Sequence, residues 1–160
     1  MTKGLKACGL LLMAAMAIGC GGMAGAERKE PSSPDPMLGM LHKGILQLTM
    51  NIDGLTKRMG ELRHFPDTTD PTLRELRALD LSGWELHQQQ WLIQRDHLQF
   101  AYELLQRAKA SPAEKPQFLE RWIKHEQEFE KVMGDFRQQR HAMEQQRLQI
   151  EAQGVERELR

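Results

Sequence analysis

Apolar residues recur every three or four positions between residues 38 and 62. The run is Leu38, Leu41, Ile45, Leu48, Ile52, Leu55, Met59 and Leu62. This alternation is an a/d heptad pattern over four repeats, and it predicts a helix with one narrow apolar seam that another helix can cover. Asp35-Pro36 has the pattern of an N-cap followed by Pro at the first helical position, and Pro66 marks the end. We therefore expect a helix from residue 36 to about residue 64.

A second helix is predicted from Pro71 to about Ala110, because Asp70-Pro71 repeats the start signal. It carries two apolar stripes offset by two residues, which is about 200° around a helix. One is Trp84, Trp91, Leu98 and Leu105, and the other is Leu79, Leu86, Ile93 and Phe100. A helix that is apolar on two sides is typical of a middle helix with a neighbour on each. Ser82-Gly83-Trp84-Glu85 has capping-box spacing, so we also expect a kink or restart there.

A third helix is predicted to begin at Pro112 or Pro116 and to run past Gln149. Its seam is Phe118, Trp122, His125, Phe129, Val132, Phe136, Met143 and Ile150. Beyond Phe136, other positions of the seam are polar (Gln139 and Gln146), so the segment from about 139 to 160 is expected to protrude as a polar extension.

The expected fold is all-α. It is an elongated antiparallel three-helix bundle or coiled-coil-like hairpin, with a fourth short helix as an option, because short connections make successive helices antiparallel neighbours. Glycines at 39, 44, 54 and 60 lie inside the first helix, and each costs about 1 kcal/mol relative to Ala. They either allow close approach of another helix or are tolerated breaks.

The N-terminus has the features of an export signal. Lys3 and Lys6 precede an apolar run from Gly9 to Ile18, which is too short to span a bilayer. The run ends in Ala17-Ile18-Gly19-Cys20, which resembles the lipobox of bacterial lipoproteins, with Ala17 where that class usually has Leu. An ordinary secretory signal with an incidental cysteine is the alternative interpretation.

The resemblance implies cleavage before Cys20, diacylglyceryl modification of its sulfur and acylation of the new amino terminus. Together these acyl chains, of the palmitate type, would anchor the protein in the lipid bilayer. Gly21, rather than Asp, follows the cysteine. This resembles the sorting signal of lipoproteins that are delivered to the outer membrane and face the periplasm. The chain then divides into a signal peptide (1–19), a lipidated cysteine with a Gly-, Ser- and Pro-rich tether (20–35) and a helical bundle (36–160).

Composition excludes several classes of function. Removing Lys3 and Lys6 leaves 20 basic against 22 acidic residues. The chain therefore lacks the excess of basic residues that is typical of nucleic-acid-binding proteins. Cys8 lies in the discarded segment and Cys20 would carry lipid, which leaves no thiol chemistry. No phosphate-binding glycine loop or nucleophile motif occurs, so we expect no enzyme and no cofactor.

No two histidines are three or four residues apart, so no helix face presents a histidine pair and no metal site is predicted. A b-type haem held by Met37 or Met40 with His141 is a weaker alternative, and covalent haem is excluded because Cys-x-x-Cys-His is absent. His125 lies on a core seam, where burial would lower its pKa and protonation would loosen the bundle; a partly exposed, hydrogen-bonded histidine is the other interpretation.

The leading hypothesis is a non-catalytic, membrane-anchored periplasmic lipoprotein that acts as a protein–protein interaction or scaffold module. Its candidate contact residues are Leu41, Leu48, Leu55, Leu62, Met143 and Ile150. They would bind another protein. A homodimer through the seam of the first helix is the competing use of the same residues, since Ile at a with Leu at d suits parallel dimers. The alternative is a periplasmic helical-bundle sensor or binding protein for a metal or another ligand.

Overall fold

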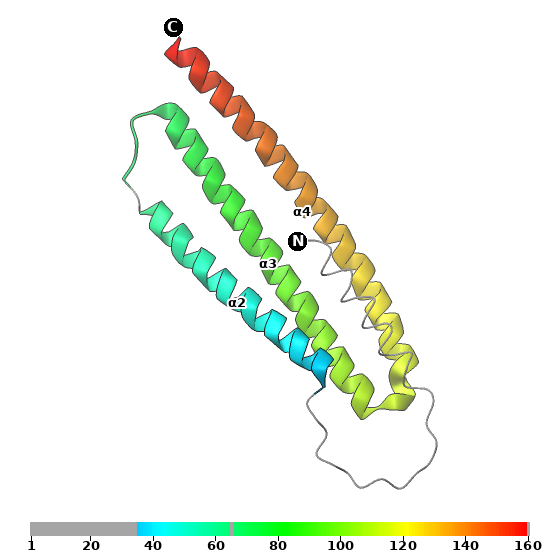
Figure 1. Cartoon of the computed structure of the whole chain (residues 1–160). Coiled ribbons are helices and arrows are strands. Elements are labelled where there is room, and N and C mark those ends of the chain that lie inside the picture. The colour runs from blue at the N-terminus through cyan, green and yellow to red at the C-terminus, as the bar shows by residue number, and fades with distance from the viewer. Residues whose placement is uncertain (1–34, 65, 160) are drawn as a thin grey trace. The chain divides into compact units, whose positions relative to one another are not determined.

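The computed structural model describes residues 35–64 and 66–159, and within this part the chain is an all-α helical bundle without strands, as predicted (Figure 1). The helices are α2 (Pro36–Arg63), α3 (Pro71–Ala110) and α4 (Lys115–Glu158), with a single 3-10 turn, η2 (Pro112–Glu114), between the last two. The predicted signal peptide, Cys20 and the predicted tether before Asp35 lie outside the described residues.

Two of the predicted helix starts are formed by aspartate caps. Asp35 Oδ1 accepts a hydrogen bond of 2.7 Å from the backbone N–H of Met37, and Asp70 Oδ1 accepts one of 2.8 Å from Thr72. These bonds satisfy donors that have no partner within the first helical turn. Ser111 makes no such side-chain bond, and α4 begins at Lys115, after η2, rather than at either predicted proline.

The contacts divide the described chain into two units, to which each long helix contributes one segment. Of the described residues, unit 1 comprises 35–46 and 96–129, and unit 2 comprises 47–64, 66–95 and 130–159. Each unit is described by itself below.

Unit 1 has a core to which all three helices contribute. Its buried members are Leu41 from α2, Ala101, Leu104, Leu105 and Ala108 from α3, and Phe118 and Trp122 from α4. Gly44 of α2 lies so close to α3 that an added Cβ would stand 2.9 Å from Leu98 Cδ1. Gly39, which also lies in unit 1, has nothing within 4 Å of such a Cβ. The close-approach role is therefore confirmed for Gly44 and not for Gly39.

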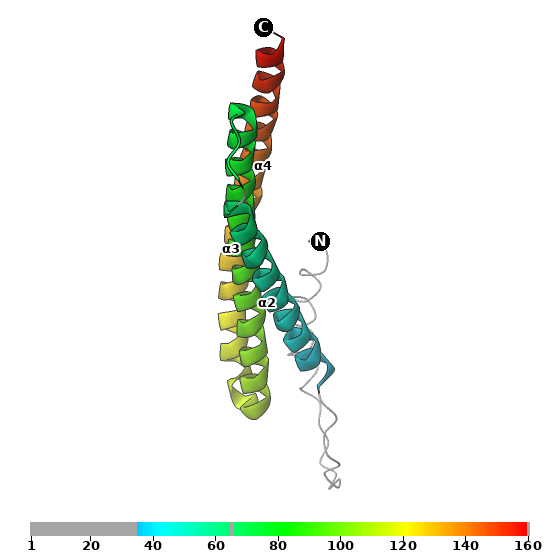
Figure 2. The same ribbon diagram turned by 90° about the vertical axis from the view of Figure 1, so that its left-hand side faces the viewer.

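In unit 2, polar contacts join α3 to both of its neighbours. Arg63 of α2 pairs with Glu85 at 2.5 Å, and Arg147 of α4 pairs with Asp80 at 3.2 Å. Both views of the ribbon place α3 and α4 side by side in this unit (Figures 1 and 2). The prediction that the second helix has a neighbour on each side is thus confirmed within unit 2.

Two local expectations were wrong. The helix does not break at Ser82, whose hydroxyl instead donates to the carbonyl of Ala78 at 3.0 Å, and Gly83 packs against Met143 within a continuous α3. The end of α4 is not a free extension, because Gly154 lies against Thr72 and Arg157 donates to the Thr72 hydroxyl at 3.3 Å. The first turn of α3 reaches this point, since α3 is 40 residues long.

Candidate functional sites

An apolar groove runs between α3 and α4 in unit 2, with a cavity volume of about 610 Å³. Ala78, Leu79 and Leu86 line it from α3, and Ala142, Met143 and Ile150 line it from α4. Its remaining lining residues are polar: Glu75, Ser82, Gln139 and Gln146. Small residues on both helices keep the groove open, and its apolar floor with a polar rim is the type of surface that accepts another helix.

The structure brings together only two of the six residues predicted for interaction. Met143 is half-buried and Ile150 is buried, and both line the groove. Leu41 is 2% exposed in the core of unit 1, so its side chain offers no surface there. Leu48, Leu55 and Leu62 are half-buried on α2 in unit 2, where Leu62 also lines a smaller hollow of about 430 Å³.

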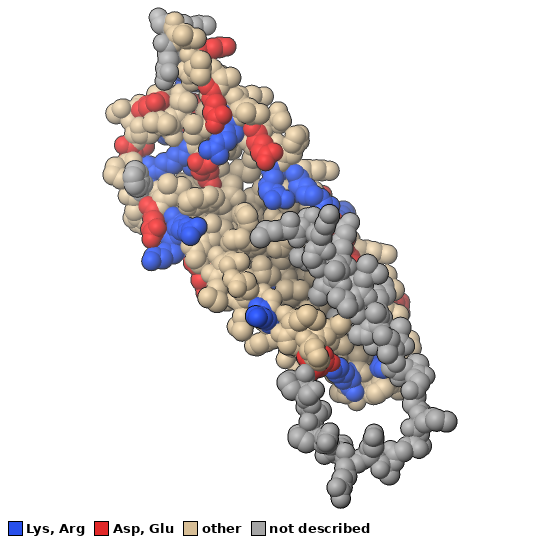
Figure 3. Space-filling model, viewed as in Figure 1, with Lys and Arg blue, Asp and Glu red and all other residues tan. Residues whose placement is uncertain are grey.

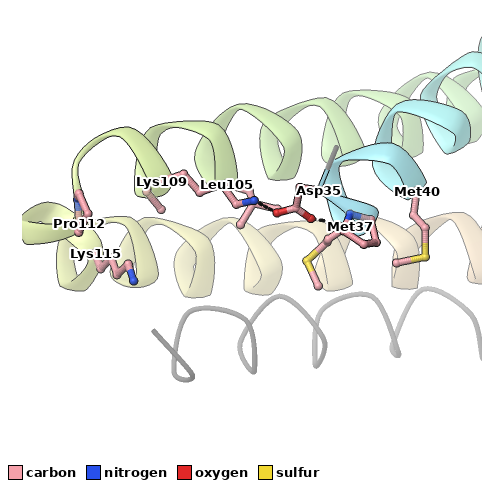
Figure 4. Close-up of a pocket in the computed structure, with 9 residues that line it drawn as sticks. Asp35, Met37, Met40, Leu105, Lys109, Pro112 and Lys115 are labelled. Atoms are coloured by element: carbon pink, nitrogen blue, oxygen red, sulfur yellow. Dashed lines mark hydrogen bonds and ion pairs between the residues drawn. The ribbon is translucent and has the colours of Figure 1, made fainter. Parts of the chain in front are cut away.

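A second cavity, of about 540 Å³, opens in unit 1 beside the start of α2 (Figure 4). Met37 and Met40 line it from α2, and Leu105 lines it from α3. Asp35 closes one edge by pairing with Lys109 while it also caps α2. None of its described lining residues is a histidine, and His141, the predicted haem partner of Met37 or Met40, is an exposed residue of unit 2.

A cluster of aromatic and histidine side chains fills unit 1 between α3 and α4. The His97 ring stacks on Phe129 with a centroid distance of 3.8 Å, and on His125 at 5.1 Å. The His125 ring also meets Phe100 at 4.1 Å. The prediction named His125 but missed His97, although His97 follows Ile93 by four residues and precedes Phe100 by three and so shares the face of that apolar stripe.

Burial controls the charge of both histidines. His97 is 5% exposed, and its burial, with a smaller contribution from neighbouring His125, lowers the pKa of His97 from 6.5 to about 4. Burial also lowers the pKa of His125, against an opposing effect of the Glu128 carboxylate. His97 Nε2 lies 3.5 Å from a Glu126 oxygen, while His97 Nδ1 and His125 Nε2 are buried with no hydrogen-bond partner among the described residues. Burial therefore favours the neutral form of both rings, and for His125 this is the direction expected from its place on the core seam.

Comparison with known proteins gives no relative. No family model, no curated protein and no solved structure matches this chain.

Neither metal binding nor membrane spanning is indicated in the described part of the chain. Within residues 35–64 and 66–159, no three His, Cys, Asp or Glu side chains are placed to hold a metal ion, and no helix is both long and apolar enough to cross a bilayer. Lys and Arg side chains are interspersed with Asp and Glu on the face seen in Figure 3. That face therefore presents mixed charge rather than a field of one sign.

Proposed function

We propose that this chain is a lipid-anchored protein of the bacterial envelope that acts through protein–protein contacts rather than catalysis. The observation that carries the interaction role is the open apolar groove between α3 and α4, to which Met143 and Ile150 contribute. Burying the exposed parts of Met143 and Leu79 beneath a partner helix would be favourable, at about 25 cal/mol per Å² of apolar surface.

The anchoring part of the proposal rests on the sequence Ala17-Ile18-Gly19-Cys20 and its resemblance to a lipobox. Acylation of Cys20 at two or more positions would hold the protein durably, whereas one acyl chain binds only marginally. Residues 20–35 would then join the anchor to α2, and Gly21 supports sorting to the outer membrane facing the periplasm.

Mass spectrometry of the protein from envelope membranes tests the anchor. We expect an N-terminal fragment that begins at Cys20 and carries the mass of a diacylglyceryl group and an acyl chain. The Cys20→Ala variant is expected to leave the membrane fraction. A mature chain with an unmodified Cys20 sulfur would refute the anchoring.

The groove is tested by substitution at its floor. Leu79→Glu places a charge among apolar side chains and should abolish contacts made through the groove, since an unpaired charge is costly to bury. Leu73→Glu is a matched control, because Leu73 is another leucine of α3 in unit 2 and is 53% exposed outside the groove. Crosslinking on whole envelopes that gave the same adducts for both variants would refute the groove as the contact surface. Circular dichroism of each variant verifies that its helices are retained.

Two measurements on the protein purified from its own host distinguish the interaction proposal from the alternative of a metal or ligand sensor. A bound transition metal in elemental analysis, or a Soret band in the absorbance spectrum, would replace the interaction proposal with the sensor. Their absence would leave contacts between proteins as the function to pursue.

A further inference from the structure

The cavity of unit 1 beside the start of α2 combines apolar walls with a small excess of positive charge. Its volume of about 540 Å³ falls in the range of small-ligand sites, roughly 300–1,000 Å³. Three of its described lining residues are charged, namely Asp35, Lys109 and Lys115, so two cations stand against one anion. The other described lining residues are apolar: Pro36, Met37, Met40, Leu105, Ala108 and Pro112. Apolar walls with a few placed charges are typical of ligand sites.

The unbalanced charge is that of Lys115. One Asp35 carboxylate oxygen pairs with Lys109 and the other caps α2, so the charges of Asp35 and Lys109 offset each other. Lys115 is half-buried at the start of α4 and forms no ion pair with any residue that the structure describes. Its neighbour Glu114 is exposed and is not among the described residues that line the cavity. Lys115 is therefore the group that an anion entering this space would meet.

The arrangement of the lining side chains suits an amphiphilic ligand. In Figure 4 the labelled side chains run from Pro112 and Lys115 at one end to Met40 at the other, with Met37 between them. Met40 is 59% exposed, so the apolar end can be reached from solvent. Unbranched thioether side chains adapt to ligands of varied shape. A cation at one end of a row of apolar side chains fits a flexible hydrocarbon chain that ends in an anionic group.

We propose that this cavity binds one acyl chain of an anionic phospholipid, with the lipid phosphate beside Lys115. The inference rests on the proposed function, because anchoring through Cys20 would hold the protein at a bilayer. Fifteen residue steps separate Cys20 from Asp35, which itself lines the cavity. Such a tether spans at most about 50 Å, so the lipids around the anchor lie within reach of the cavity.

Charge distinguishes an anionic lipid from a zwitterionic one at this site. A phosphatidylglycerol headgroup brings a net negative charge to Lys115, whereas a phosphatidylcholine headgroup brings its own cation together with its phosphate. The neighbouring part of α2 adds no repulsion, since residues 36–46 contain Lys43 and no acidic residue. The cavity should therefore prefer phosphatidylglycerol to phosphatidylcholine, although both lipids offer the same acyl chains.

Photochemical labelling of the protein purified from envelope membranes tests the site. The protein is reconstituted into phosphatidylcholine vesicles that contain a trace of phosphatidylglycerol or phosphatidylcholine with the same photoreactive acyl chain. After irradiation, mass spectrometry locates the label. We expect the phosphatidylglycerol probe to label the peptides that contain Met37, Met40 and Leu105. The phosphatidylcholine probe should label them about threefold less, which is the effect of one partly exposed ion pair.

Substitution of Lys115 tests the phosphate contact. Lys115→Gln should reduce labelling by the phosphatidylglycerol probe about threefold and leave labelling by the phosphatidylcholine probe unchanged. Lys124→Gln is the matched control, because Lys124 is an exposed lysine of α4 in unit 1 and is not among the described lining residues. It should change the labelling by neither probe.

Substitution of Met40 tests the apolar wall. Met40→Glu should reduce labelling of the cavity by both probes about fivefold, because hydrocarbon would have to cover an unpaired carboxylate. Leu46→Glu is its control, since Leu46 is 52% exposed on α2 in unit 1 and is not among the described lining residues. Both side chains are exposed, so neither change should impair folding, and circular dichroism verifies this.

A third probe, a free fatty acid with the same photoreactive chain, separates the two sources of an anionic chain. Labelling of the cavity by the fatty acid that equals labelling by phosphatidylglycerol would overturn the phospholipid as the ligand. Equal labelling by the two phospholipids, or labelling that Lys115→Gln leaves unchanged, would overturn the proposal as well.

The outcomes separate this inference from the anchoring proposal when lipidation of Cys20 is measured on the same samples. A lipidated protein whose cavity is not labelled selectively by phosphatidylglycerol overturns the lipid site and leaves the anchor. An unlipidated protein with selective labelling that is lost in Met40→Glu supports the lipid site and overturns the anchor.

Discussion

Acidification should destabilise this protein through His97. The His97 ring is buried against Phe129 and His125, and its Nε2 lies 3.5 Å from a carboxylate oxygen of Glu126. Protonation would place a charge among these rings. Because the pKa of His97 in the folded state lies below the unfolded value of 6.5, the folded protein binds fewer protons, so its stability is complete above pH 6.5 and falls as the pH drops towards 4.

The size of the effect follows from the pKa shift. A fall from 6.5 to about 4 corresponds to about 3 kcal/mol when the pH is below both values, since one pKa unit is about 1.4 kcal/mol. At pH 5 about 2 kcal/mol of this is already lost, because the unfolded chain is almost fully protonated there while the folded His97 is mostly neutral. Total stabilities of domains this size are commonly about 5–15 kcal/mol, so such a loss is measurable.

Urea unfolding at pH 7.5 and pH 5.0, followed by circular dichroism, measures the effect. His97→Phe keeps a ring on Phe129 but removes the titrating group, so its free energy of unfolding should fall by about 2 kcal/mol less than that of the parent protein between the two pH values. His141→Phe, at an exposed site, should behave as the parent does. The reasoning is refuted if the His97→Phe variant and the parent lose the same stability on acidification.

Other substitutions test the packing of α2. Gly54→Ala should raise the free energy of unfolding by up to about 1 kcal/mol, because Gly54 is helical and an added methyl meets nothing within 4 Å. Gly44→Ala should raise it by less, because the Leu98 side chain must move to make room for the methyl. Equal increases for the two variants in urea unfolding would contradict this reasoning. Leu41→Ala should lower the same free energy by about 2–5 kcal/mol through loss of core contacts, and a thermal midpoint unchanged from the parent would show the site to be exposed. Asp35→Ala should cost about 1 kcal/mol as a lost cap, whereas Asp35→Asn, which keeps the capping oxygen, should cost less in the same measurement.

The heptad pattern predicted the helices well because it reports burial along one face. Leu41, Ile52 and Met59 of the predicted seam are buried, and the Asp-Pro pairs mark the starts of α2 and α3. These features depend on residues close in sequence, so a local pattern is sufficient to identify them.

The heptad pattern of each helix could not predict the axial register of two packed helices, that is, which residues of one lie beside which residues of the other. That alignment places Thr72 beside Gly154, so the polar end of α4 packs on α3 instead of protruding. It also places His97 against His125 and Phe129. The spacing of His97 from Ile93 and Phe100 did put it on an apolar face, but a seven-residue repeat of apolar residues does not include a polar residue at the intervening position. The groove was missed because the register was not predicted: Met143 and Ile150 were identified, but not Leu79 and Leu86 as the opposite wall.

Asp35 also fixes where a recombinant fragment can begin. One carboxylate accepts the Met37 N–H and pairs with Lys109 near the end of α3, so a fragment that starts at this aspartate retains both interactions. Starting one residue later removes both at once and places a charged amino terminus on Pro36. A protease that cuts before Asp35 would therefore release the helical body with its first turn intact, which makes this residue the natural boundary for crystallisation and for solution work.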